Sequence, residues 1–207
     1  MASQLIPLFQ TEIYSQKAFL KDSEIKSLQE ECYQIRNSDL VGRRWSQKNY
    51  LGGYTSYASI PQVQLLSSSF HELEKKIHRH VVKFSEQLEY EVKAKNLYCN
   101  SLWINIMPPG VVHTGHIHPQ SFISGTVYLA VPPKASSLKF EDPRLGFFMA
   151  APLQKKKLKP QHQRFFHFSP GAGDLVLFES WLRHEVPANP ARKDRISVSF
   201  NYDWKGL

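Results

Sequence analysis

The chain has 207 residues, of which 42% are hydrophobic and 13% aromatic, and its formal charge is +8. This length is enough for one domain with a sizeable core, and the composition excludes a disordered chain. The two cysteines, Cys32 and Cys99, form no CxxC pair, so neither a disulfide framework nor a thiolate zinc site is expected. Because the sequence shows neither a signal peptide nor a long apolar run, we expect a cytoplasmic protein without a membrane segment.

Much of the positive charge lies in one segment, 154–164, which reads "QKKKLKPQHQR" and contains no acidic residue. Removing its five lysine and arginine charges from +8 leaves +3 on the rest of the chain. The segment is either a solvated loop or a lid that contacts an anionic partner. No RNA-binding, helix-turn-helix or zinc-finger pattern is present, so a nucleic-acid partner is not expected.

The N-terminal half has helical periodicity. Apolar residues recur every three or four positions in 22–37, "DSEIKSLQEECYQIRN", which predicts an amphipathic helix. A longer helix is predicted after Pro61, because apolar residues keep the same spacing from Leu66 to Leu88. Between them, 43–57 is expected to form a loop with a short strand and a turn at Gly52 and Gly53.

After residue 97 the period changes to two. Pro- and Gly-rich breaks separate short runs rich in Val, Ile, Phe and Tyr, which predict seven or eight strands: "YCNSLWINIM", "ISGTVYLAV", "SSLKFE", "LGFFMA", "RFFHFS", "DLVLF" and "RISVSFNYDW". Such a pattern is typical of a β-sandwich or barrel. We therefore expect a single domain over 1–207, with a helical covering layer over 1–97 and a β-barrel core over 98–204.

Two histidines are separated by one residue in "HIHPQSFISGTVYL", which begins at residue 116. On an extended strand, His116 and His118 lie on the same face and form a chelating pair. The alternative is a pair of surface or core histidines without a metal. His78 and His80 have the same spacing, but on a helix two positions correspond to about 200°, so their rings point apart.

A third ligand must come from elsewhere in the chain, and His184 is the candidate. It follows the apolar strand in "GDLVLFESWLRHEV" and begins another short extended stretch. Arg195 starts the alternating run "RISVSFNYDW", in which Arg195 and Ser197 share one face. That face is either solvated or turned inward, and a buried guanidinium would require a carboxylate partner.

These features together resemble the iron(II)- and 2-oxoglutarate-dependent oxygenases of the double-stranded β-helix fold, in particular their prolyl-hydroxylase-like branch. The similarity is specific over 98–204 and weaker over 5–97. It implies a mainly β fold with flanking N-terminal helices, in the jelly-roll or cupin-like class. It also implies a dioxygenase, specifically a hydroxylase, that oxidises 2-oxoglutarate to succinate and carbon dioxide.

The resemblance also implies roles for individual residues. His116 and His184 would bind iron(II), Arg195 would bind the distal carboxylate of 2-oxoglutarate, and Tyr128 and Ser197 would assist. The family pattern has a carboxylate where this chain has His118. Three neutral imidazoles would weaken iron(II) binding and make the metal a stronger Lewis acid.

Several positions stay open between a functional and a structural role. Asn105 either faces the keto acid or is a satisfied core residue. His113 faces away from His116 on a regular strand, whereas an irregular strand would place it at the substrate mouth; Trp181 is a second candidate for that mouth. Pocket walls are expected from loops 40–58, 108–115 and 150–165.

Two alternatives to a 2-oxoglutarate-dependent hydroxylase remain. One is a three-histidine dioxygenase that does not use 2-oxoglutarate, and the other is a non-catalytic barrel that binds a metal or an anion. The sequence does not identify the prime substrate, which is either a small molecule or a protein. The basic loop over 154–164 would suit an anionic substrate. A homodimer is compatible with the sequence but is not required by it.

Overall fold

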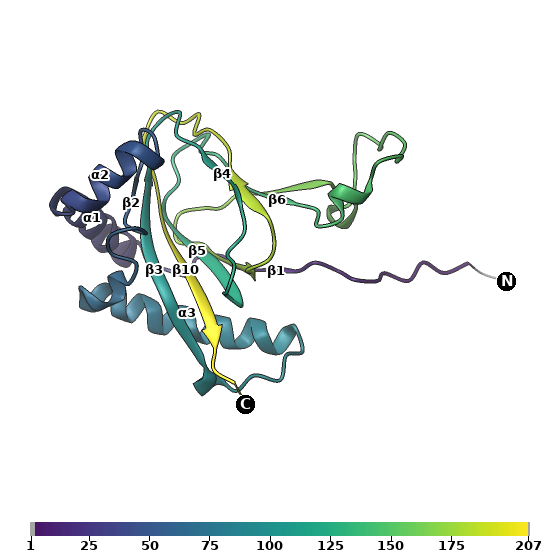
Figure 1. Ribbon diagram of the computed structural model, residues 1–207, viewed down its shortest axis with the longest axis horizontal. Coiled ribbons are helices and arrows are strands. Elements are labelled where there is room, and N and C mark those ends of the chain that lie inside the picture. The colour runs from purple at the N-terminus through teal and green to yellow at the C-terminus, as the bar shows by residue number, and fades with distance from the viewer. Residues whose placement is uncertain (1–2, 207) are drawn as a thin grey trace.

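The computed structural model describes residues 3–206, and two antiparallel sheets form its centre (Figure 1). The larger sheet has the order β1-β8-β5-β10-β3-β2 and the smaller one β4-β9-β6-β7. The strands are β1 (Ile13–Gln16), β2 (Tyr54–Thr55), β3 (Leu97–Met107), β4 (His113–His116), β5 (Ile123–Ala130), β6 (Leu138–Glu141), β7 (Phe165–Phe168), β8 (Leu175–Glu179), β9 (His184–Val186) and β10 (Arg195–Trp204). This arrangement confirms the predicted double-stranded β-helix with flanking helices.

Three helices lie on the outer side of the larger sheet (Figure 1): α1 (Asp22–Ser38), α2 (Leu40–Asn49) and α3 (Ser68–Gln87). Along α3, one stripe of apolar side chains is buried, from Phe70 to Phe84, as its spacing predicts. This stripe packs in the same core cluster as Ile196, Val198 and Phe200 of β10. No helix within residues 3–206 has the length and apolar character needed to cross a membrane.

The opposite face of β10 is polar, yet it is also buried. Arg195, Ser197 and Asn201 are each at most 5% exposed. In the strand register, Ser197 lies opposite both Asn105 of β3 and Tyr128 of β5, and Asn201 lies opposite Ser124. The polar alternation therefore does not mark a solvated face, because it lines the space between the two sheets.

The structure corrects the prediction of a loop over 43–57, since α2 continues to Asn49. Asp39 is the N-cap of this helix and accepts a hydrogen bond from the backbone N–H of Gly42 at 2.8 Å. The same carboxylate accepts the hydroxyl of Tyr54 at 2.9 Å, which ties α2 to β2. Tertiary contacts thus stabilise a helix that has little apolar periodicity of its own.

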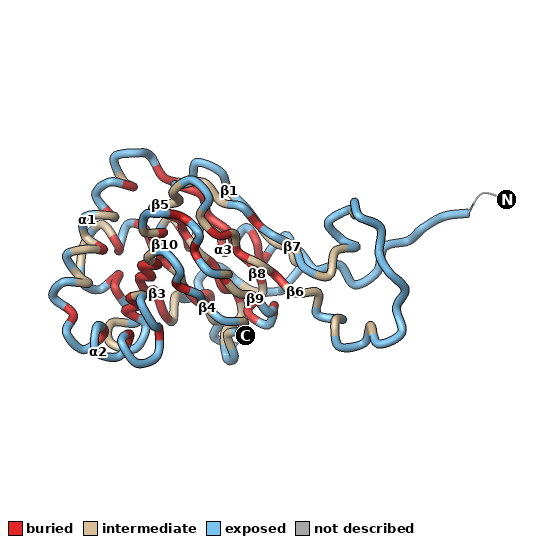
Figure 2. The backbone as a smooth tube through the Cα atoms, turned by 90° about the horizontal axis from the view of Figure 1, so that it is seen from above, coloured by how far each residue is buried: buried red, intermediate tan, exposed pale blue. Residues whose placement is uncertain are grey.

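The predicted strand "LGFFMA" is also wrong, because Leu145–Phe147 is a single 3-10 turn. It belongs to an arm, residues 142–164, that connects β6 to β7 and projects away from the barrel beside the N-terminal segment (Figure 2). Phe147 and Met149 are 84% and 93% exposed, so no neighbouring strand pairs with this run. The remaining short 3-10 helices are Val63–Leu65, Ala94–Asn96 and Pro160–His162.

The packing of α3 predicts a large difference between its two faces. Ile77→Ala should lower the free energy of unfolding by about 2–5 kcal/mol, because Ile77 is fully buried beneath the larger sheet. Arg79→Ala, two residues along on the exposed face, should change it by less than about 0.5 kcal/mol. Urea denaturation checks both variants, and equal effects would contradict the described burial.

Candidate active site

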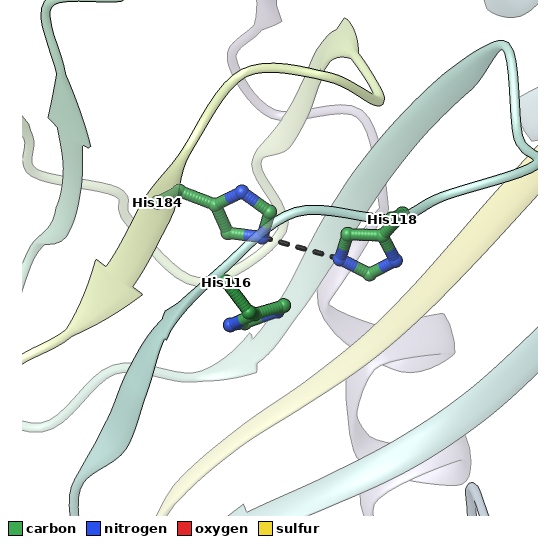
Figure 3. A group of neighbouring side chains, drawn as sticks. All are labelled: His116, His118 and His184. Atoms are coloured by element: carbon green, nitrogen blue, oxygen red, sulfur yellow. Dashed lines mark hydrogen bonds between the residues drawn. The ribbon is translucent and has the colours of Figure 1, made fainter.

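Three histidines meet where the two sheets face each other (Figure 3). His116 is the last residue of β4 and pairs directly with His184, the first residue of β9. His118 follows β4 in a loop, held by a 2.9 Å hydrogen bond from its N–H to the carbonyl of Ser180. One nitrogen of each ring lies within 4.8 Å of the others. The structure therefore brings together the three histidines that the sequence predicted as one cluster.

Backbone carbonyls fix the tautomers of two of these rings. Nδ1 of His116 lies 2.7 Å from the carbonyl of Thr114, and Nδ1 of His184 lies 2.8 Å from the carbonyl of Leu182. A carbonyl can only accept, so each Nδ1 must carry the proton and each Nε2 keeps a free lone pair. This is the arrangement found behind metal-binding histidines, whose second nitrogen usually donates to a carbonyl or carboxylate.

The imidazoles are also kept neutral. Burial, together with neighbouring His116, lowers the pKa of His184 to about 2 and that of His118 to about 4, and burial lowers the pKa of His116. Nε2 of His118 lies 3.2 Å from Nε2 of His184. Two nitrogens that bind one metal ion at about 2.1 Å lie about 3.0–3.4 Å apart, so the spacing suits a shared ion.

Arg195 lies deeper in the same space and has no countercharge among residues 3–206. It is 2% exposed, forms no salt bridge there, and its Nε has no hydrogen-bond partner. Its one hydrogen bond runs from Nη1 to the sulfur of Met107 at 3.5 Å, and burial lowers its pKa. A buried guanidinium without a partner is costly, so this environment is incomplete without an anion.

Other polar groups around the guanidinium are unpaired as well. The hydroxyl of Tyr128 and Oδ1 of Asn105 are buried without a hydrogen-bond partner, and the guanidinium carbon lies 5.0 Å from the Tyr128 ring centre. Burial raises the pKa of Tyr128 to about 12, which keeps its hydroxyl a donor at neutral pH. Ser197 is buried on the same wall. These groups line a narrow inner cavity of about 30 Å³ that also reaches the three histidines.

The sequence analysis missed Tyr50, whose buried hydroxyl is also unpaired. It is the C-cap residue that follows α2, and its ring lies 5.4 Å from that of His113. Burial raises the pKa of its phenol, and the positive charge of Arg195 partly opposes this rise. No spacing rule links residue 50 to residue 195, because only the packing of α2 against the barrel brings them together.

The positions left open by the sequence also have defined places. The register of β4 shifts between His113 and His116, so the strand is irregular and the two rings stack, with centres 4.7 Å apart. His113 therefore lines the cavity beside the cluster, and burial lowers its pKa to about 3. Trp181, in the turn between β8 and β9, does not line this cavity or the outer cleft.

A larger cleft of about 860 Å³ opens outward from the histidines. Its walls come from the regions 45–57, 100–103 and 110–121, together with Asn201. Two of the predicted loops, 40–58 and 108–115, thus contribute to the pocket. The third, 150–165, contributes none of its residues to the cleft, because it belongs to the projecting arm (Figure 2).

A family model described as "Putative 2OG-Fe(II) oxygenase" matches residues 101–201, which contain all three histidines, Tyr128 and Arg195. The matched region covers 101 of the 207 residues, and the chain is similar to this family over that part. The oxygenase is therefore an enzyme of the class that the sequence resemblance indicated, and iron(II) and 2-oxoglutarate are the cofactors that the family's name gives. A comparison with curated proteins found no match.

Solved structures share the fold of this oxygenase at low sequence identity. The α-ketoglutarate-dependent epimerase SnoN from nogalamycin biosynthesis matches with a TM-score of 0.68 and 15% identity, over 93% of this chain and 76% of its own. A prolyl-4-hydroxylase from Pseudomonas putida matches with a TM-score of 0.62 and 17% identity, over 95% of this chain and 94% of its own. HygX from Streptomyces hygroscopicus, solved with nickel and 2-oxoglutarate, matches with a TM-score of 0.65 and 14% identity, over 95% of this chain and 84% of its own.

The uncompensated charge predicts an unusual stability effect. In the ligand-free oxygenase, Arg195→Met should raise the free energy of unfolding by about 1–3 kcal/mol, because an apolar chain replaces a buried cation without a partner. Arg192→Met, at a neighbouring exposed position, should leave stability within about 0.5 kcal/mol. Denaturant titration of both variants checks this, and a marked destabilisation by Arg195→Met would show that the guanidinium already has a partner.

Proposed function

We propose that this oxygenase is a 2-oxoglutarate-dependent hydroxylase in which His116, His118 and His184 bind iron(II) and Arg195 binds the cosubstrate. The observation that carries the proposal is the buried, unpaired guanidinium in a cavity shared with three converging imidazoles. A metal alone would leave Arg195 uncompensated. A dicarboxylate that reaches from the histidines to Arg195 would supply negative charge both to the metal and to the guanidinium.

The chain's own groups define how the cosubstrate is held. The guanidinium fork of Arg195 binds the distal carboxylate, and the hydroxyl of Tyr128 donates to the same group. Oδ1 of Asn105 is an acceptor, so it cannot pair with a carboxylate and needs a donor, while its amide nitrogen donates to Ser199 at 3.1 Å. Ser197 offers a further hydroxyl on this wall.

When bound, iron(II) with 2-oxoglutarate supplies the oxidising chemistry, in which one atom of dioxygen enters succinate and the other enters a substrate C–H bond while carbon dioxide leaves. The protein's residues orient this reaction and exclude water. The fixed tautomers of His116 and His184 leave their Nε2 lone pairs free for the metal, and the apolar side chains of Leu138 and Phe178 close the inner cavity. The outer cleft leaves one approach open to a substrate.

The first test is anaerobic titration with iron(II) and 2-oxoglutarate, which should give the visible charge-transfer band of the chelate. His184→Ala should abolish the band, and Arg195→Ala should weaken 2-oxoglutarate binding by about 2–5 kcal/mol, as expected for truncating one partner of a buried charge pair. His71→Ala, on the exposed face of α3, is the control and should keep the band.

Other results of this titration would favour the alternatives. Iron(II) binding with no 2-oxoglutarate band would indicate a three-histidine dioxygenase that ignores the keto acid. Tight zinc retention, with no succinate formed from 2-oxoglutarate, would indicate a non-catalytic barrel. Either result would contradict the proposed function.

A separate variant tests the role of His118. His118→Asp replaces a neutral ligand by an anionic one, so it should retain iron(II) with equal or higher affinity, whereas His118→Ala should lose affinity by about tenfold or more. Metal affinity from competition with a chromophoric chelator checks the pair. Equal iron(II) affinities in His118→Ala and the unmodified protein would show that His118 is not a ligand. The predicted cytoplasmic location and homodimer are not part of this proposal and stay predictions.

A further inference from the structure

The outer cleft in front of the histidines has an unusual composition. None of its lining residues, within the part of the chain that the structure describes, is Asp, Glu, Lys or Arg. Charged residues make up 21% of this chain, and its formal charge is +8. The other surface pockets do contain charged groups, such as Arg144 in one and Lys76 in another. The entrance to the site is thus uncharged in a strongly basic molecule.

The sequence of α2 shows how the cleft avoids charge. Trp45 and Asn49 are four residues apart and lie on the face of α2 that lines the cleft. The cations of the same helix, Arg43, Arg44 and Lys48, are absent from the lining.

The uncharged lining combines aromatic faces with amides and hydroxyls. Trp103 and Tyr57 meet edge to face, with ring centres 5.0 Å apart, and Trp45 is 38% exposed at the rim. Aromatic faces carry partial negative charge and attract the C–H edges of a ring laid against them. The amides of Asn100 and Gln120 both donate and accept, so they match hydroxyl groups, which also do both.

We infer that the substrate of this oxygenase is an uncharged, polyhydroxylated ring compound, such as the neutral sugar unit of a glycoside. An anionic or cationic substrate would lose hydration in the cleft and find no countercharge there. An extended peptide is disfavoured by the strand edges. β2 has two residues and β4 is irregular, so neither edge offers the regular ladder along which a peptide strand adds. The inference rests on the proposed function, because it places the ring at the open approach to the metal.

The test compares three related probes of different charge: phenyl β-glucoside is neutral, phenyl β-glucuronide carries a carboxylate at C6, and phenyl β-glucosaminide carries an amino group at C2. Isothermal titration calorimetry uses the full chain loaded with manganese(II) and 2-oxoglutarate under nitrogen, at physiological ionic strength. We expect the neutral glucoside to bind at least about tenfold more tightly than either charged analogue. Tightest binding by the glucuronide would overturn the inference, because it would show that the net positive charge selects the substrate.

Variants locate the binding. Trp45→Ala should weaken glucoside binding by about fivefold, since it removes an exposed aromatic face but keeps a good helix former in α2. Trp204→Ala removes a tryptophan of similar exposure, 46%, that does not line the cleft, and should leave the affinity unchanged. Equal effects of the two substitutions would overturn the placement of the ring.

Two further outcomes separate this inference from the proposed function. Thermal stabilisation by 2-oxoglutarate, measured on the manganese(II)-loaded protein with and without the keto acid, reports the inner site alone. If it is present but no glucoside binds below about 10 mM, or a capped uncharged peptide of Gly, Ser and Tyr binds more tightly, the inference is wrong and the proposed function stands. Glucoside binding without any effect of 2-oxoglutarate would contradict the proposed function instead.

Discussion

A single buried cation, the guanidinium of Arg195, governs how the interior of this protein is organised. It begins β10, the strand that pairs with both β3 and β5 at the centre of the larger sheet. One face of that sheet is covered by helices, which leaves the other face as the place where polar groups can meet. Within the described chain that face offers Arg195 aromatic rings and hydroxyls but no carboxylate. The guanidinium of Arg195 is therefore left to pair with a ligand.

The two sheets supply different residues to the site. The larger sheet supplies the guanidinium and its polar neighbours, whereas β4 and β9 of the smaller sheet supply His116 and His184 as a directly opposed pair. Because opposed residues on neighbouring antiparallel strands lie close together, this pairing brings two imidazoles together without a special loop. His118 completes the cluster from the chain that leads back toward the larger sheet.

Much of this could be predicted from local sequence patterns. The alternation in "RISVSFNYDW" placed Arg195 and Ser197 on one face, and the spacing of His116 and His118 predicted their proximity. The predictions that failed concern features that depend on contacts between residues far apart in the sequence. The helix α2 depends on Asp39 as its cap and on Tyr54 for its position, and the role of Tyr50 follows from that docking. The register shift that turns His113 toward His116 depends on pairing with β9, which no local pattern encodes. The run 145–150 had strand composition but no neighbouring strand.

The acceptors that orient the two strand histidines, at Thr114 and Leu182, belong to the main chain. Exchanging the side chains at those two positions would therefore leave both acceptors in place. The exposed Thr114 can therefore be substituted without loss of its acceptor, whereas Leu182 is also held by its packing in the core. An insertion or deletion of one residue beside either histidine would move its ring out of alignment. The geometry of the histidine cluster is consequently more sensitive to changes in loop length than to substitution of the Thr114 side chain.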